Sequence, residues 1–165
     1  MDAADQPLPI RHRETVQDAW VDYNGHMNVA YYILVFDHAT DGLFDQIGLD
    51  AASRDAMGGS AFVVESHVSY LNEVMAGEAV EVDTRVLDVD DKRMQVFHRM
   101  FRAGNEHETV ATNELLLIYI DMKARRAAAM PADVRRRLDA LKAVSDQMPP
   151  PPEAGRSIAI RRRKK

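Results

Sequence analysis

The chain has 165 residues, of which 46% are apolar and 28% charged, a balance typical of a single soluble globular domain. The lack of cysteine excludes disulfides, thiolate nucleophiles and sulfur metal sites, and no apolar stretch approaches the length of a membrane span. The formal charge of −5 is uneven: residues 149–165 carry six bases against one acid, or +5, which leaves −10 on the rest. An acidic body argues against nucleic acid as the main partner, and a start without a secretory signal predicts a cytoplasmic protein without a membrane partner.

A first strand is predicted over Ile10–Val21, where polar and apolar residues alternate loosely. The polar turn Asp22–Asn28 interrupts it. A long helix is predicted over Val29–Ile47, because apolar residues recur there at helical spacing, with Asn28 as its N-cap and Gly48 as its C-cap. So broad an apolar surface predicts that the rest of the chain wraps around this helix.

Four further strands are predicted from apolar runs separated by turn signals: Ala61–Asn72, Ala79–Val89, Met94–Arg102 and Glu108–Asp121. Their short connections predict an antiparallel meander, and a last helix is predicted to follow Pro131. The sequence therefore predicts one α+β domain over residues 1–148, with a sheet curled around the long helix. The Pro-rich, then basic residues 149–165 predict a flexible tail. Exposed sheet edges predict a homo-oligomer, either a dimer or a tetramer.

The turn before the long helix gathers an acid, amides, a glycine and an imidazole: Asp22, Asn24, Gly25, His26 and Asn28. Such a turn is costly beside a buried helix unless its donors and acceptors are satisfied or used. One interpretation is a catalytic loop that delivers a carbonyl to the amino end of the helix, where N–H groups favour negative charge. The structural alternative is that Asp22 and Asn24 only form the turn and cap the helix.

The segment Trp20–Tyr32 and the order of elements around it resemble the hotdog-fold thioesterases of the 4-hydroxybenzoyl-CoA thioesterase type. In that family a strand runs into a loop of the form Asp-x-x-Gly-(His or apolar)-x-x-x-x-Tyr, which opens the central helix. Asp22, Gly25, His26 and either Tyr31 or Tyr32 match this pattern. The pattern Asp-x-Asn-x-His-x-Asn of plant acyl-carrier-protein thioesterases is matched as well. The whole segment, with Phe62–Tyr70, resembles bacterial thioesterases of carnitine and betaine catabolism more fully.

The resemblance implies a hotdog fold, with a five-stranded antiparallel sheet around the central helix and a C-terminal helix. It also implies hydrolysis of a short acyl-CoA such as betainyl-CoA or dehydrocarnitinyl-CoA. Asp22 would act as general base or nucleophile, with His26 and Asn24 assisting, and the backbone N–H groups of Gly25 and His26 would bind the oxyanion. Two alternatives stay open: a thioesterase for fatty or aromatic acyl-CoA or for acyl-carrier protein, and a non-catalytic acyl-CoA-binding module.

A quaternary ammonium acyl group would be recognised by a carboxylate and aromatic faces. Glu65, on an apolar strand, is the candidate carboxylate, although a solvent-exposed sheet edge explains it equally well. Trp20, Tyr32 and Phe36 are the candidate aromatic partners, although Tyr32 and Phe36 are also suited to the core. His98 and Arg99 are predicted at the sheet surface. The six histidines show no ligand spacing, so neither a metal nor a cofactor other than the substrate's CoA is expected.

Overall fold

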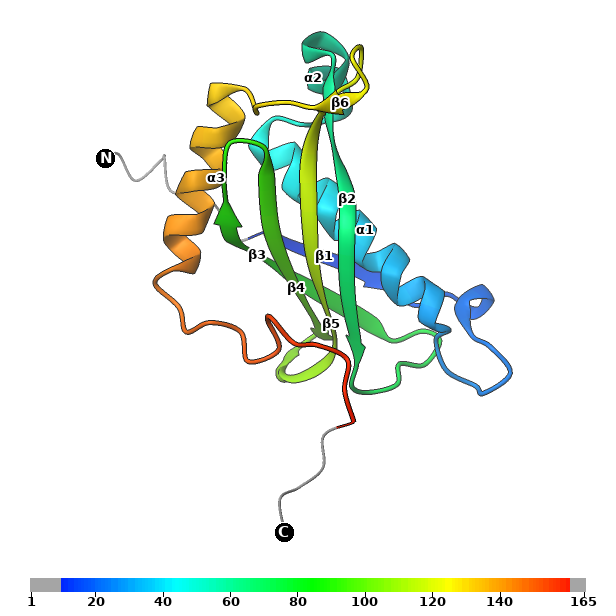
Figure 1. Cartoon of the computed structure of the whole chain (residues 1–165). Helices are drawn as coiled ribbons and strands as arrows, with labels where there is room; N and C mark the ends of the chain where they lie inside the picture. Colours follow the sequence, from blue (N-terminus) through cyan, green and yellow to red (C-terminus); the bar gives the residue numbers. More distant parts are fainter. Residues whose placement is uncertain (1–9, 161–165) are drawn as a thin grey trace.

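The computed structural model describes residues 10–160 (Figure 1). Residues 1–9, where the predicted absence of a secretory signal falls, and 161–165, the basic end of the predicted tail, lie outside the described residues. One antiparallel sheet has the strand order β1-β3-β4-β5-β2, and the two-residue β6 pairs with β5. Its strands are β1 (Ile10–Thr15), β2 (Gly59–Tyr70), β3 (Ala79–Val89), β4 (Arg93–Arg102), β5 (Asn105–Asp121) and β6 (Arg126–Ala127).

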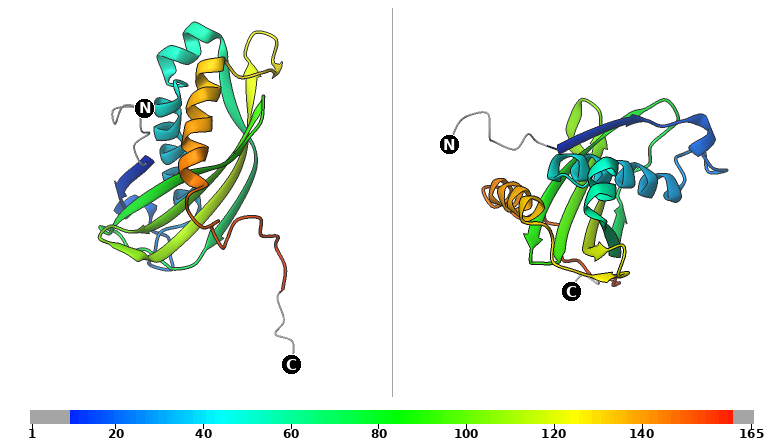
Figure 2. Two further views of the ribbon diagram at one scale, coloured as in Figure 1. Left: turned by 90° about the vertical axis from the view of Figure 1, so that its left-hand side faces the viewer. Right: turned by 90° about the horizontal axis from the view of Figure 1, so that it is seen from above.

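The helix α1 (Val29–Ile47) lies along one face of the curved sheet (Figures 1 and 2). Its bounds confirm the prediction, because both caps form. The Asn28 side chain accepts a hydrogen bond from the N–H of Ala30, and Gly48 ends the helix at φ 79°, a left-handed conformation that glycine adopts without strain. Eight of its residues are buried against the sheet: Tyr32, Val35, Phe36, Ala39, Thr40, Leu43, Phe44 and Ile47.

The first strand is shorter than predicted. β1 ends at Thr15, and a 3-10 turn, η2 (Asp18–Trp20), then carries the indole of Trp20 into the core, where it is 6% exposed. The predicted extension to Val21 was wrong, because Trp20 is buried on this turn rather than at an alternate position of a strand. This turn brings the chain to the amino end of α1.

The predicted meander is confirmed only for β3, β4 and β5. β2 pairs with β5 rather than with the next strand β3, which pairs instead with β1. The chain between β2 and β3, residues 71–78, therefore passes from one edge of the sheet toward the other. On the way it meets the turn before α1, where Val74 O accepts a hydrogen bond from the N–H of Met27 at 2.8 Å.

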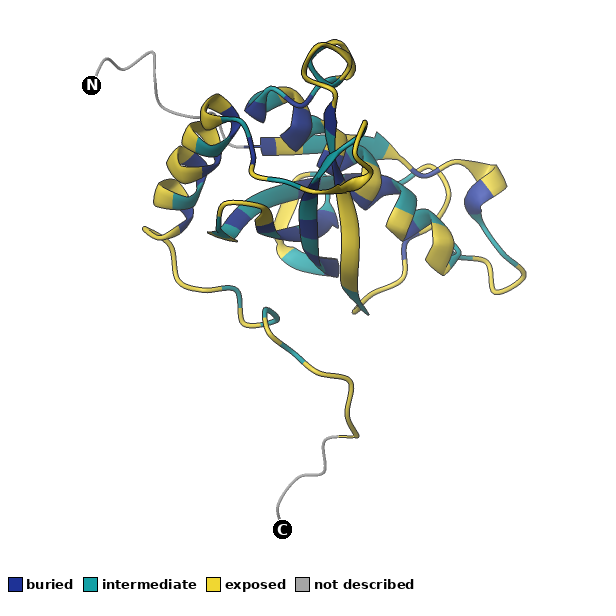
Figure 3. Cartoon of the chain, turned by 45° about the horizontal axis from the view of Figure 1, so that its top comes forward, coloured by how far each residue is buried: buried dark blue, intermediate teal, exposed yellow. Residues whose placement is uncertain are grey.

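Two short helices complete the fold: α2 (Ala51–Met57) after α1, and α3 (Ala132–Ser145), which packs against β3 and α1. The predicted apolar face of α3 is confirmed, since Val134, Leu138 and Leu141 are buried while its outer face is exposed (Figure 3). No helix within residues 10–160 is long and apolar enough to span a bilayer.

The chain after α3 crosses the sheet on the face opposite α1 (Figure 1). The guanidinium of Arg85 donates to Pro149 O at 2.9 Å and to Ser145 O at 2.8 Å, and the N–H of Gly155 donates to the Glu114 carboxylate at 2.7 Å. The described part of the predicted tail, residues 149–160, thus starts with contacts to the domain. The flexibility of residues 149–165 stays a prediction.

Candidate active site

The turn between β1 and α1 is closed by its own backbone. The N–H of Asp22 donates to His26 O at 3.1 Å, the N–H of Gly25 donates to Asp22 O at 3.0 Å, and Val21 pairs with Met27 as an isolated bridge. Gly25 stands at φ 84°, a value that L side chains rarely adopt, which explains the glycine at this position. The segment Val21–Asn28, which we call the Asp22 loop, is therefore a defined turn at the amino end of α1.

Both carboxylate oxygens of Asp22 accept a hydrogen bond within this loop. Oδ1 accepts from the backbone N–H of Asn24 at 2.8 Å, and Oδ2 accepts from the side-chain amide of Asn28 at 3.1 Å. The other end of that amide, Asn28 Oδ1, accepts from the N–H of Ala30 at 3.0 Å. Asn28 thus fixes the Asp22 carboxylate to the first turn of α1. The sequence predicted Asn28 only as the N-cap of the helix and did not predict this second role.

The backbone N–H groups that are available to bind an oxyanion differ from the two predicted from the sequence. The N–H of Gly25 is already bonded to Asp22 O, whereas the N–H groups of His26 and Val29 have no hydrogen-bond partner within residues 10–160. Val29 is the first residue of α1, where an unpaired N–H group adds to the positive end of the helix dipole. The general rule that the first helical N–H groups are unpaired could have indicated Val29 from the sequence.

Within residues 10–160, the polar contacts of the His26 side chain are with groups other than the Asp22 carboxylate. Its Nδ1 lies 3.3 Å from Met27 O and its Nε2 lies 3.9 Å from the Glu73 carboxylate, on the chain between β2 and β3. Asn24 is exposed and reaches Asp22 through its backbone N–H rather than its side chain. The structure therefore groups Asp22 with Asn28 and the backbone of Asn24, and places the imidazole of His26 at the rim of the loop.

The predicted aromatic residues lie at different depths. Trp20 is 6% exposed and stacks on Tyr31 with ring centroids 5.3 Å apart, next to the loop. Tyr32 is 3% exposed and its hydroxyl donates to Asn72 O at 3.2 Å, while Phe36 is 0% exposed and stacks on His98. Within one protomer, Tyr32 and Phe36 therefore occupy the core rather than a surface that a ligand reaches.

Glu65 lies on the exposed edge strand β2, beside a register shift between Val63 and Glu65. The far end of β2 reaches the first residue of α1, because the Tyr70 hydroxyl donates to Val29 O at 3.4 Å. Glu65 and Tyr70 lie five positions apart on the strand, which corresponds to roughly 17 Å. Within the described residues, no hydrogen bond or ion pair joins the Glu65 carboxylate to Asp22.

The prediction that His98 lies at the sheet surface was wrong. Its ring is fully buried between β4 and α1, with Nε2 3.0 Å from Thr40 Oγ1 and Nδ1 2.9 Å from Thr84 Oγ1. The Thr40 hydroxyl donates to Phe36 O, so it accepts from His98 Nε2, and the Thr84 hydroxyl donates to Nδ1. Burial lowers the pKa of His98 to about 3, and this arrangement satisfies the neutral ring.

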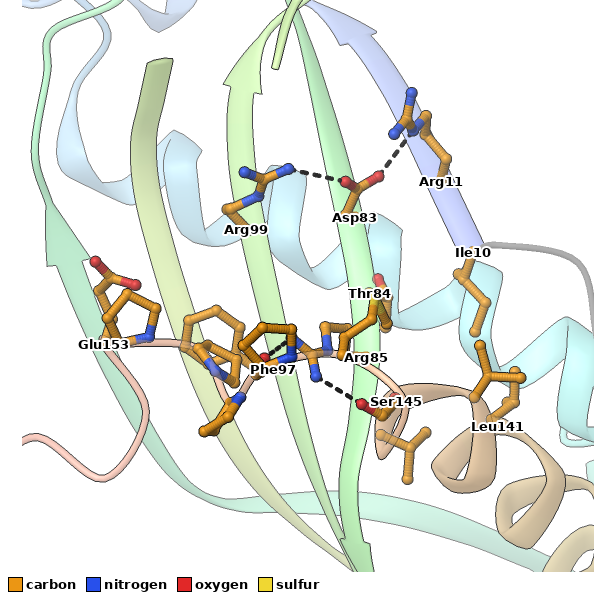
Figure 4. A pocket seen from close by; sticks show the side chains of 17 residues that line it. Ile10, Arg11, Asp83, Thr84, Arg85, Phe97, Arg99, Leu141, Ser145 and Glu153 are labelled. Atoms are coloured by element: carbon orange, nitrogen blue, oxygen red, sulfur yellow. Dashed lines mark hydrogen bonds and ion pairs between the residues drawn. The ribbon is translucent and has the colours of Figure 1, made fainter. Parts of the chain in front are cut away.

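A cavity of about 570 Å³ lies away from the Asp22 loop, between α3, the chain after it and the sheet face opposite α1 (Figure 4). Three arginines line it, and Asp83 pairs with two of them, Arg11 and Arg99. No residue of the Asp22 loop lines this cavity. The loop itself lies on an open surface, since its own residue Tyr23 is 95% exposed.

Comparison with known proteins identifies the class that this fold and loop define. The model of the thioesterase-like superfamily matches residues 16–138, so the chain belongs to this superfamily. A putative thioesterase from Pseudomonas putida has the same fold, with 38% identity, a TM-score of 0.80, and coverage of 94% of this chain and 98% of that one. Protein SAV2348 from Staphylococcus aureus, solved in complex with CoA, has 25% identity, a TM-score of 0.87, and coverage of 97% and 100%.

Two curated relatives are more specific. The betainyl-CoA thioesterase of Pseudomonas aeruginosa is 40% identical over 141 residues, which cover 86% of this chain and 88% of that protein. The L-carnitine dehydrogenase/betainyl-CoA thioesterase of Agrobacterium fabrum is 46% identical over 155 residues, which cover 94% of this chain and 31% of that protein. The chain thus spans about a third of the length of this second, larger relative. The predicted resemblance and the hotdog fold are confirmed.

Proposed function

We propose that the chain is a thioesterase that hydrolyses betainyl-CoA to betaine and free CoA. The observation that carries this proposal is the Asp22 carboxylate, held by two hydrogen bonds at the amino end of α1. The N–H groups of His26 and Val29, which have no partner in the described part of the chain, belong to the same segment. The names of the two curated relatives support the choice of acyl group. Dehydrocarnitinyl-CoA, the other expected substrate, is a chemically related alternative for the same site.

The proposed reaction needs only groups that this chain and water supply. The oxygen of water, deprotonated by Asp22, or the carboxylate itself attacks the thioester carbon. The carbonyl oxygen then becomes an oxyanion, which the N–H groups of His26 and Val29 stabilise together with the helix dipole. The C–S bond breaks, the CoA thiolate leaves and takes a proton, and in the nucleophilic route water hydrolyses the resulting anhydride. No cofactor takes part in the proposed reaction.

We also propose a cytoplasmic location, with which the lack of cysteine agrees.

We further propose that the working enzyme is a homo-oligomer built on a dimer. The free edge of β2 exposes an apolar row, with Phe62 40%, Val63 48% and Val64 56% exposed. An apolar edge strand of this length favours pairing with a second copy. Glu65 lies five positions, or roughly 17 Å, along β2 from Tyr70, whose hydroxyl contacts the first residue of α1. We therefore propose that its carboxylate meets the trimethylammonium group in a site that spans two protomers.

The experiment that tests the proposed chemistry compares the turnover of Asp22→Asn with that of Asp18→Asn. Asp18 is an exposed acid four residues earlier on η2, so its amide is a matched control for charge and location. We expect Asp22→Asn to lower kcat for betainyl-CoA by about 10²–10⁴-fold, the usual contribution of a positioned base, with an unchanged circular dichroism spectrum. Equal turnover by the two variants would refute the role of Asp22. If both variants also hydrolyse betainyl-CoA no faster than the uncatalysed reaction, the result would favour the non-catalytic acyl-CoA-binding module.

A further inference from the structure

The inward face of β1 carries two polar residues at positions where the strand pattern requires apolar ones. β1 and the residue after it alternate regularly, with Ile10 6% and Val16 2% exposed on the face toward α1. His12 and Glu14 lie between them on the same face and are partly buried. Polar side chains in such positions are costly unless each finds a partner.

The partner comes from α1. Glu14 Oε2 lies 3.0 Å from His12 Nε2 and 2.9 Å from His38 Nδ1, so a single carboxylate oxygen stands between two imidazole nitrogens. The three candidate ligand atoms all lie within 4.8 Å of one another, and the two rings are 5.9 Å apart between centroids. None of these residues belongs to the Asp22 loop.

From this geometry we infer that His12, Glu14 and His38 bind a Zn²⁺ ion. Two imidazole nitrogens and one carboxylate oxygen are the ligand set of zinc sites that keep a fourth position for water, and the partial exposure of the cluster supplies that water. Ligand atoms bound at about 2.1 Å stand no more than about 4.2 Å apart, so side-chain shifts of under about 1 Å assemble the site.

The hydrogen-bonding geometry of the cluster is compatible with an ion. One carboxylate oxygen of Glu14 lies within hydrogen-bond distance of both rings. Each imidazole presents a lone pair to the ion in the tautomer that carries its proton on the other ring nitrogen.

The ion would join β1 to α1 across the ends of the segment that carries the Asp22 loop. Residues 15–37 lie between the ligands, so the ion would fix the base from which the loop projects. The six histidines are scattered along the sequence, which is why the sequence analysis predicted no metal. The site appears only when the fold brings His38, 24 residues from Glu14, onto the same face. This inference is independent of the proposed thioesterase activity.

The test uses the full chain without an affinity tag, treated with EDTA and dialysed, and then titrated with Zn²⁺ in a calorimeter. We expect one ion to bind per protomer, and a rise in Tm of roughly 5–10 °C at a free Zn²⁺ concentration of about 100 Kd. Co²⁺ in place of Zn²⁺ should give the visible d–d absorption of a low-coordinate site. Zn²⁺ added afterwards should displace Co²⁺ and abolish this absorption.

Variants decide where the ion binds. Loss of an outer-shell partner costs about 10–100-fold in metal affinity, so His38→Gln and His12→Gln, which each remove a ligand, should weaken Zn²⁺ binding by about 100-fold or more. His107→Gln, which removes an exposed histidine from β5, should bind Zn²⁺ as the natural chain does. Zn²⁺ that leaves the Tm of the natural chain unchanged, or that binds His38→Gln and His107→Gln equally well, would overturn the inference.

Discussion

The side-chain amide of Asn28 makes two hydrogen bonds, one through its oxygen and one through its nitrogen. Its oxygen caps α1 through the N–H of Ala30, and its nitrogen donates to Asp22 Oδ2. The cap contributes to stability, while the other bond holds the Asp22 carboxylate, which we propose to be the reacting group, in place. Because serine also caps helices but lacks the reach and the amide donors of asparagine, the two contributions can be separated by substitution.

We expect Asn28→Ala to lower the free energy of unfolding by about 0.5–2 kcal/mol, the usual cost of a lost N-cap, and Asn28→Ser to leave it nearly unchanged. Both variants should lower kcat for betainyl-CoA by about 10–100-fold, because a hydrogen bond to a charged group contributes about 1.5–3 kcal/mol. Urea unfolding and steady-state kinetics measure the two quantities. An Asn28→Ser enzyme with full activity would show that the bond to Asp22 is not needed.

His98 couples stability to pH because its ring is neutral in the fold. Its pKa is about 3 in the folded protein, below the ordinary value near 6.5 of the unfolded chain. Between these values the unfolded chain binds a proton that the folded protein does not, so stability falls as the pH drops through this window and is unaffected above it.

For the natural chain, this one group should reduce the free energy of unfolding by about 1.4 kcal/mol between pH 7.5 and pH 5.5. In His98→Gln, which lacks the titrating ring, that part of the pH dependence should disappear, although the variant is less stable at every pH. Urea unfolding of both proteins at the two pH values measures this difference. Glu14 and the other carboxylates contribute equally to the pH dependence of both proteins, so their contributions cancel. An identical pH dependence in both proteins would contradict the buried neutral ring.

At the scale of secondary structure, the elements with local signals are those that the sequence predicts well. α1 is correct at both ends because Asn28 and Gly48 mark its caps. β1 was predicted too long because the burial of Trp20 on the turn η2 imitates strand alternation. The pairing of β2 with β5 was missed because nothing in a local pattern reports which distant strand is adjacent.

The free edge of β2 makes a prediction about assembly. A charge in the proposed dimer interface brings two like charges together and buries them, so Val64→Glu should dissociate the dimer. Met57→Glu adds the same charge to another exposed apolar residue, on α2, and should leave assembly intact. Sedimentation velocity measures the oligomeric state, and turnover should fall with the dimer in Val64→Glu alone. A Val64→Glu dimer with full turnover would exclude this edge as the interface.

At the scale of the whole molecule, the sequence predicts the position of the Asp22 loop better than the surroundings of the Asp22 carboxylate. Asp22, Gly25 and His26 stand together in one short motif, so the loop could be recognised without a structure. The bond from Asn28 and the occupied N–H of Gly25 depend on how the loop closes, which a motif does not specify. The grouping of His12, Glu14 and His38 depends on contacts between β1 and α1 and could not be predicted at all.

The central claim is that the site hydrolyses a thioester whose acyl group carries a permanent positive charge. The most direct measurement compares kcat/KM for betainyl-CoA with that for 3,3-dimethylbutanoyl-CoA, in which carbon replaces the quaternary nitrogen and the shape is retained. A desolvated cation–aromatic or carboxylate contact contributes about 2 kcal/mol or more, so we expect betainyl-CoA to be preferred by at least about 30-fold and Glu65→Gln to reduce that preference. Equal or faster hydrolysis of the neutral analogue would contradict the account of the substrate and leave a thioesterase for neutral acyl groups.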